Sequence, residues 1–272
     1  MSSSNPPQRR REIPWWLLAI VLLGLLTFWQ IVADEGMRTI FNALSSGIAT
    51  TLYVTAVAFI LASLLGLIVA MARTSRFRAL REVATFYVEI VRGIPLLVVL
   101  FYVAFVGAPA MVEGANWLLS PVIGQGWMPR LTVRNFDFTW RAIVALTVCY
   151  SAFLAEIFRA GIEAVDKGQH EAAHSLGLSR WNTFRFITFP QAFRTILPPY
   201  GNDFVSMIKD SALVSALGVQ DITQLGKVYS SSTFQFFETY NIVAFLYLTM
   251  TISLSLLVRL VEHRLKRNEH TR

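Results

Sequence analysis

The stretch from residue 39 to residue 72 reads TIFNALSSGIATTLYVTAVAFILASLLGLIVAMA and contains no charged residue. A membrane-spanning helix needs about 20 mostly apolar residues, so this stretch can cross a bilayer with residues to spare. We expect the crossing to occupy Ile48 to Ala72, and the residues before it to lie at the membrane interface. Small residues recur every fourth position on one helix face, where a second helix can approach closely, unless they only reflect how common alanine is in membrane helices. They are Ala58, Ala62, Gly66 and Ala70.

The composition of the whole chain also indicates a membrane protein. Of its 272 residues, 54% are hydrophobic and 15% are charged, and the formal net charge is +7. Soluble domains carry about 25% charged residues, so this shortage argues against a water-soluble enzyme, a disordered tail and a fibrous repeat. The basic residues stand between long apolar runs rather than on one polar face, which argues against a nucleic-acid partner. The single cysteine, Cys149, excludes an intrachain disulfide framework and a multi-cysteine zinc site.

Five further apolar segments predict an all-α, polytopic membrane protein with about six spans. The first runs over residues 14–33 and exceeds the roughly 7–15 residues of a signal-peptide core, so we expect a retained anchor. The later segments cover about residues 86–112, 140–158, from 192 onward, and 242–258. Between the third and fourth spans we expect a loop over residues 113–139, with one short helix from Trp117 to Ile123.

The basic residues set the direction of this topology. Six spans place both termini on one side of the membrane, and that side carries 17 Lys and Arg residues, against 5 on the other side and 2 at or within spans. Because basic residues concentrate in cytoplasmic loops, we expect both termini in the cytoplasm. The predicted parts are a cytoplasmic N-terminal tail (1–12), a transmembrane domain (13–265) and a cytoplasmic C-terminal tail (266–272).

The cytoplasmic loop over about residues 163–190 differs from the others. A short helix can run from Gln169 to Leu176, and Gly177 can end it in the left-handed conformation. Ser179 is a suitable N-cap for a second helix, which we expect to run as far as Pro190.

This loop resembles the EAA loop of ABC-importer permeases, which has the pattern EAA-x3-G-x9-I-x-L-P. The segments EIVRGIPLL (89–97) and AEIFRAGI (155–162) are similar to those of the polar-amino-acid importer subfamily. The resemblance covers about residues 45–265; the added first span is a departure, because many permeases of this group have five. In the EAA loop, Phe189 stands where the family usually has Leu. The matching loop residues are Glu171, Ala172, Ala173, Gly177, Ile187 and Pro190.

The resemblance implies the permease subunit of an ATP-driven importer of polar amino acids in the inner (cytoplasmic) membrane of a bacterium. The loop would then be a coupling helix that docks on a separate ABC ATPase dimer, with Ala172, Ala173 and Leu176 as its apolar face. The other implied partners are membrane lipid, a second permease subunit, identical or homologous, and an extracytoplasmic amino-acid-binding protein. The alternative is an amphipathic surface loop.

We expect no cofactor, no metal and no catalytic residue in this chain. It lacks the G-x-x-x-x-G-K-[ST] phosphate loop, so ATP and magnesium would belong to the partner ATPase.

Charged residues near or within the spans are the candidates for a substrate pathway or gate, because ionisable groups at membrane depth are costly. Glu89 with Arg92, and Glu156 with Arg159, are spaced to meet on one helix face, either as structural ion pairs near the interface or as a gate. The fifth span is the most polar, and Pro198-Pro199 frees backbone carbonyls within it. It lines the pathway or, alternatively, a contact between permease subunits. Its candidate residues are Asn202, Asp203, Ser206, Lys209 and Asp210.

Two other functions compete with this interpretation. Residues 170–174 satisfy H-E-x-x-H, the zinc motif of metalloproteases, but a third ligand is required and the other histidines, His263 and His270, lie near the C-terminus. An ion-driven secondary transporter would show paired halves with broken helices. Only the short Glu-Ile-x-Arg element recurs here, at 89–92 and 156–159.

Overall fold

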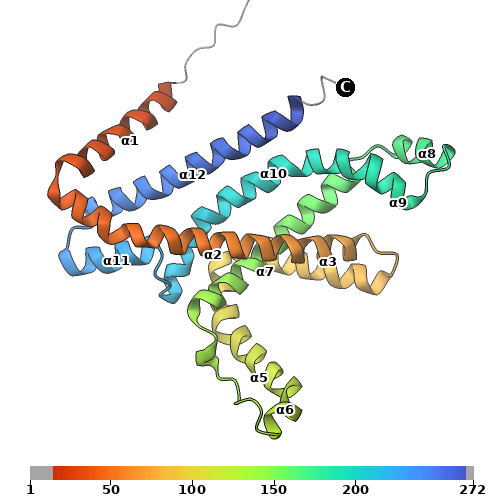
Figure 1. The fold of residues 1–272 in the computed structure, drawn as a ribbon, viewed down its shortest axis with the longest axis horizontal. Coiled ribbons are helices and arrows are strands. Elements are labelled where there is room, and N and C mark those ends of the chain that lie inside the picture. Colours follow the sequence, from red (N-terminus) through yellow and green to blue (C-terminus); the bar gives the residue numbers. More distant parts are fainter. Residues whose placement is uncertain (1–14, 268–272) are drawn as a thin grey trace, which may run out of the picture.

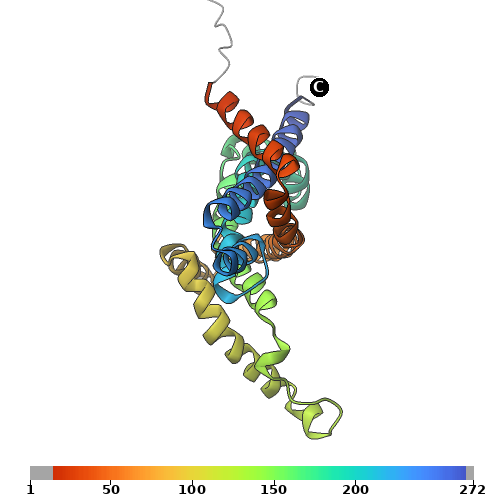
Figure 2. The ribbon, with the colours of Figure 1, turned by 90° about the vertical axis from the view of Figure 1, so that its left-hand side faces the viewer.

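The protein, described here for residues 15–267 by a computed structural model, consists of helices with no strand in that range (Figures 1 and 2). The predicted N-terminal tail (1–12) and the last five residues lie outside the described part. In chain order the elements are α1 (Trp15–Ala33), α2 (Glu35–Arg73), α3 (Arg78–Gly93), α4 (Leu96–Tyr102), the π-turn η1 (Val103–Gly107), α5 (Ala108–Leu118), α6 (Ser120–Gly124), the 3₁₀ turn η2 (Val133–Asn135), α7 (Phe138–Glu163), α8 (Lys167–Ser175), α9 (Arg180–Thr183), the π-turn η3 (Phe184–Thr188), α10 (Phe189–Asp210), the 3₁₀ turn η4 (Ser211–Leu217), α11 (Ile222–Thr233) and α12 (Phe236–Arg267).

The all-α, multi-span fold is confirmed. Within residues 15–267, four helical segments are long and apolar enough to cross a membrane, and a shorter apolar helix covers Leu18–Ala33. The four are Glu35–Arg73, Leu96–Leu118, Phe138–Glu163 and Phe236–Arg264. Helix α10 packs against α7 and α12. Its 22 residues correspond to about 33 Å at 1.5 Å per residue, the thickness of a bilayer core.

The structure adds detail to one expected boundary and corrects another. The residues expected at the membrane interface before Ile48 belong to α2, which begins at Glu35 because the Asp34 side chain caps it by accepting from the Met37 amide at 2.8 Å; where the crossing begins along α2 stays a prediction. The expected third span from Phe86 is split, since Ile94 is extended (φ −103°, ψ 137°) and the residue before a proline is forced out of the helical region. The crossing therefore begins at Leu96.

The loop expected over residues 113–139 is also more helical than predicted. Helix α5 continues to Leu118, and α6 starts at Ser120, so the expected Trp117–Ile123 helix is two pieces. The loop is fixed by Arg141, which is buried and donates to the carbonyls of Phe136 and Val133, both at 2.7 Å. Counting charges alone places Arg141 among the external basic residues and does not reveal this role.

The small-residue face of α2 forms the centre of the fold, because α2 and α7 make the most extensive helix–helix contact. Ala58, Ala62, Gly66 and Ala70 are all buried, which confirms the predicted face. A Cβ on Gly66 would lie 2.9 Å from the Ser151 carbonyl oxygen of α7. The backbones of α2 and α7 thus approach as closely as glycine permits.

A second close approach lies between α2 and the start of α11, and it supports a prediction. A Cβ on Gly47 would lie 2.6 Å from the Ile222 backbone nitrogen, which no side-chain rotation can relieve. We expect Gly47→Ala to lower the free energy of unfolding by about 1–3 kcal/mol, the usual cost of overpacking. Gly24→Ala is the control, because nothing lies within 4 Å of its added Cβ. Equal unfolding temperatures of the two purified variants would contradict this packing.

Candidate functional site

The cytoplasmic loop predicted to couple the protein to an ATPase folds as the helical turn α8 followed by a sharp stop. Asp166 caps α8 by accepting from the Gly168 amide at 2.6 Å. At the other end Gly177 has φ +74°, and the Gly177 and Leu178 amides donate to the carbonyls of His174 and Ala173 at 3.0 Å. These two bonds form a Schellman motif. The predicted helix and glycine stop are confirmed.

The surface of α8 differs in one respect from the predicted apolar face. Ala173 is 1% exposed and packs toward its own chain, whereas Leu176 is 80% exposed. Glu171 and Ala172 are exposed beside Leu176, and Glu171 forms no ion pair with any residue in the range 15–267. The surface left for a partner is therefore Glu171, Ala172, Leu176 and Gly177, without Ala173.

The helix after the glycine stop starts as predicted but ends elsewhere. Ser179 caps it by accepting from the Asn182 amide. It does not stop at Pro190, and no new helix starts at Ala192, because the π-turn η3 (Phe184–Thr188) carries α9 into α10. Proline lacks an amide and crowds the preceding turn, and a π-turn accommodates such a disruption. Helices α9 and α10 are thus continuous through η3, with Ile187 half-buried at the junction.

A chain of ion pairs joins the C-terminal parts of α2 and α7. The Glu156 carboxylate pairs with both Arg73 and Arg159, and Arg159 also pairs with Glu163 at 2.5 Å. The expected Glu156–Arg159 pair is therefore confirmed. Arg73 is the member that sequence spacing missed, because it comes from another helix.

The second expected pair, Glu89 with Arg92, is not formed. Both side chains are exposed, and the Arg92 guanidinium carbon lies 5.7 Å from the centre of the Phe153 ring. A cation over an aromatic face is stabilised at such a distance. Because α3 packs against α7, Arg92 interacts with Phe153 of α7 instead of with Glu89 of its own helix.

The polar residues of α10 divide between the interior and the surface. Asn202 and Lys209 are exposed, whereas Asp203, Ser206 and Asp210 are partly buried. Tyr150 of α7 donates to Asp210 Oδ2 at 2.7 Å. Helix α10 continues through Pro198 and Pro199, and the next residue, Tyr200, hydrogen-bonds Ser63 at 2.9 Å. Neither tyrosine was singled out from the sequence, because tyrosine within an apolar span carries no motif.

The Tyr150 hydrogen bond supports a prediction. Tyr150→Phe removes the hydroxyl donor and leaves a half-buried Asp210 carboxylate with one fewer partner. We expect a loss of about 1.5–3 kcal/mol in unfolding free energy, the usual worth of a hydrogen bond to a charged group. Tyr53→Phe is the control, because Tyr53 is exposed and makes no hydrogen bond within residues 15–267. Thermal unfolding of both proteins in the same detergent measures the difference, and matching curves would contradict the prediction.

Comparison with known proteins identifies this arrangement. The sequence profile of the family described as "Binding-protein-dependent transport system inner membrane component" matches residues 62–267. The chain belongs to this family. It is therefore an ABC-importer permease and a multi-pass protein of the inner membrane.

The permease is similar over most of its length to curated relatives. It is 34% identical over 237 residues to the probable amino-acid permease protein YxeN of Bacillus subtilis (strain 168), covering 87% of this chain and 97% of that protein. It is 32% identical over 223 residues to the glutamine transport system permease protein GlnP of Escherichia coli (strain K12), covering 82% and 93%.

Solved structures share the fold. A structure described as "Crystal structure of an amino acid ABC transporter with histidines" superposes with a TM-score of 0.70 and 36% identity, covering 84% of this chain and 97% of that chain. The MetNI methionine ABC transporter in an inward-facing conformation matches with a TM-score of 0.58 at 16% identity, covering 86% and 99%. The second match concerns the fold alone.

The H-E-x-x-H pattern has no structural counterpart. His170 and His174 both lie on α8, but residues 15–267 contain no group of three or more His, Cys, Asp or Glu side chains arranged to hold a metal. Both histidines lie within residues 62–267, the range that matches the permease family.

Proposed function

We propose that the permease imports polar amino acids and is driven by a separate ATPase dimer that docks on α8. The observation that carries the proposal is the exposed α8 surface at the end of the α7–α10 hairpin, in a chain that belongs to the binding-protein-dependent permeases (Figure 1). Curated relatives named as glutamine, arginine and cystine permeases support the substrate class. No ion-driven mechanism is needed.

The chemistry of α8 suits a protein partner. Leu176 offers one large apolar side chain, and such a group gains most when it is fully desolvated in a partner's pocket. The unpaired Glu171 carboxylate beside it would select a basic residue of the partner. ATP and magnesium would be held by that partner, and this chain would supply no cofactor ligand.

A second permease subunit would complete the pathway. Arg92, Asn202 and Lys209 are exposed on the isolated chain, although charged and polar groups in membrane helices normally face a bundle interior or a water-filled cavity. A path bordered by these groups together with Asp203, Ser206 and Glu89 carries both signs of charge, which suits a zwitterionic amino acid.

The orientation follows from the positions of the ends. The start of α1 and the end of α12 lie on the same side of the molecule, while α5 and α6 extend to the opposite side (Figure 1). Together with the basic residues, this supports cytoplasmic termini. The external end carrying α5 and α6 would then receive the amino-acid-binding protein.

Purification through a tag on this chain tests the proposal. We expect an ATPase subunit to co-purify in equal amount with the permease, and ATP hydrolysis in proteoliposomes to rise when a polar amino acid and its binding protein are both present. Screening amino acids one at a time would name the substrate. A permease that purifies without an ATPase and transports along an ion gradient would contradict the proposal.

A further inference from the structure

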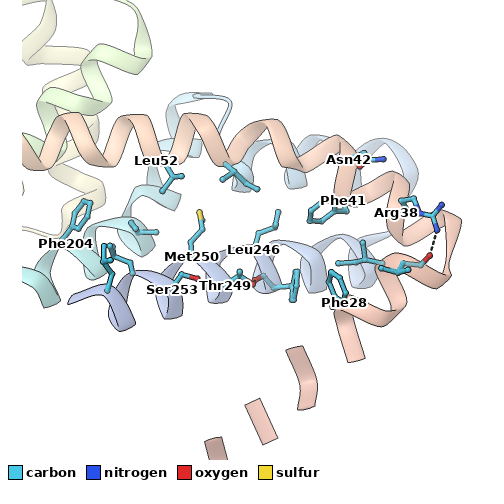
Figure 3. A pocket seen from close by; sticks show the side chains of 17 residues that line it. Phe28, Arg38, Phe41, Asn42, Leu52, Phe204, Leu246, Thr249, Met250 and Ser253 are labelled. Atoms are coloured by element: carbon cyan, nitrogen blue, oxygen red, sulfur yellow. Dashed lines mark hydrogen bonds between the residues drawn. The ribbon is translucent and has the colours of Figure 1, made fainter. Parts of the chain in front are cut away.

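A large apolar groove lies apart from the coupling loop and the polar face of α10. It has a volume of about 1000 Å³ and is lined by α1, α2, α10 and α12. That volume is at the upper end of the range for ligand pockets, about 300–1,000 Å³. Figure 3 shows Leu52, Leu246 and Met250 pointing into the space between α2 and α12, with Phe28 and Arg38 at one end. We call this space the α1–α12 groove.

The helix α1 that borders the groove carries exposed apolar side chains, as expected for a surface that lipid covers. Among the α1 side chains that the structure describes, Ile31 alone is buried, so α1 exposes apolar groups on nearly all sides, including its face toward α12. Helix α1 packs mainly against α2 and α12, and the free ends of α1 and α12 stand apart (Figure 2). A helix that is apolar all round is stable where lipid covers it.

The polar end of the groove carries a positive charge. Arg38 is the single charged residue lining it. One of its terminal nitrogens, Nη2, donates to the Val32 carbonyl, and among residues 15–267 Arg38 has no acidic partner. The neighbouring Asp34 carboxylate is engaged as the cap of α2. Since a guanidinium has five N–H donors, several remain for an anion, and phosphate fits them in a bidentate arrangement.

Arg38 also lies at the right depth for a lipid headgroup. The 19 residues of α1 rise about 28 Å, close to the 30 Å of the hydrocarbon core, and Arg38 follows within about one turn of the start of α2. From Arg38 the groove continues along α2 to Leu52, about 21 Å at 1.5 Å per residue. That length spans the hydrocarbon of one leaflet, about 15 Å.

We propose that the α1–α12 groove binds one phospholipid of the outer leaflet. Its phosphate is held by the Arg38 guanidinium and an acyl chain lies between α1 and α12 against Met250 and Leu246. A second permease copy is the competing occupant. The groove combines one cation at its end with a long apolar channel, and this combination matches the phosphodiester and acyl chain of a phospholipid better than it matches a protein surface. The site is distinct from the coupling surface, and the proposal does not depend on the transported substrate.

Native mass spectrometry of the intact transport complex tests this site. We expect the wild-type complex to retain phospholipid from the membrane, and Arg38→Gln to lower its occupancy about fivefold, as expected for loss of one cation worth about 1 kcal/mol at a membrane surface. Arg134→Gln is the matched control, because Arg134 is exposed in the outer loop and does not line the groove. Ser253→Trp should fill the groove and displace the lipid, whereas Ile252→Trp, on the adjacent exposed position, should not.

Three results would overturn the proposal. A wild-type complex without bound phospholipid would do so, as would equal lipid retention in Arg38→Gln and Arg134→Gln. A disulfide between the two permease copies through Ser253→Cys would show that a second copy fills the groove. Because Arg38→Gln leaves the packed core untouched, it tests the site even if Ser253→Trp fails to assemble.

Discussion

Leu176→Asp should release the ATPase from the permease and abolish amino-acid-stimulated ATP hydrolysis. Leu176 is 80% exposed at the end of α8, beside the left-handed Gly177, which holds it outward. In the docked complex we expect Leu176 to be buried at the centre of the contact, where full burial of a leucine side chain is worth about 2 kcal/mol. A carboxylate in that pocket should weaken association by about thirtyfold or more. The measurement is the amount of ATPase retained on the tagged permease at increasing dilution.

Leu118→Asp is the control for this variant. Leu118 ends α5 and is 72% exposed, so the same change is made at a similar exposure on the opposite side of the molecule. It should retain the ATPase fully. If both variants bound the ATPase like the wild type, α8 would not be the docking element.

Glu156→Gln should destabilise the permease where α2 and α7 end. The change removes the carboxylate that pairs with both Arg73 and Arg159, and leaves the Arg73 side chain, 11% exposed, without its counter-charge. Breaking a fully buried pair costs about 3–5 kcal/mol, and an exposed pair is worth about 0–1 kcal/mol. Since Glu156 is partly exposed, we expect a loss of about 2 kcal/mol, seen as a lower unfolding temperature of the purified protein.

Glu82→Gln provides the matched comparison. It breaks the Arg78–Glu82 pair, in which the atoms are 3.9 Å apart and the side chains are 85% and 64% exposed. We expect a change below about 0.5 kcal/mol, typical of an exposed helical pair. Equal losses in the two variants would show that the ion pairs between α2 and α7 do not stabilise the fold more than an exposed pair does.

The features that the sequence predicted well depend on local chemistry. Gly177 and Ser179 act within one turn of their own position, and the four-residue spacing of small side chains on α2 depends only on helix geometry. For that reason the amino-acid sequence alone was enough to predict three features: the end of α8 at Gly177, the Ser179 N-cap of the next helix, and the small-residue face of α2 that packs on α7.

The predictions that were wrong concern features that depend on contacts between distant segments. Ala173 and Leu176 have similar local sequence environments, and only packing of α8 on the following turns decides that Ala173 is buried. Glu89 and Arg92 have the spacing of an ion pair, but Phe153 of another helix interacts with Arg92. Pro190 is a typical helix end, but η3 carries the helix past it.

Uptake into proteoliposomes tests the central claim most directly. The purified complex would be reconstituted with ATP enclosed in the vesicles, and a radiolabelled polar amino acid would be added outside with its binding protein. We predict accumulation that requires both ATP and the binding protein and that is lost in Leu176→Asp but not in Leu118→Asp. Accumulation that proceeds without ATP, or that is unchanged in Leu176→Asp, would contradict a permease driven through α8.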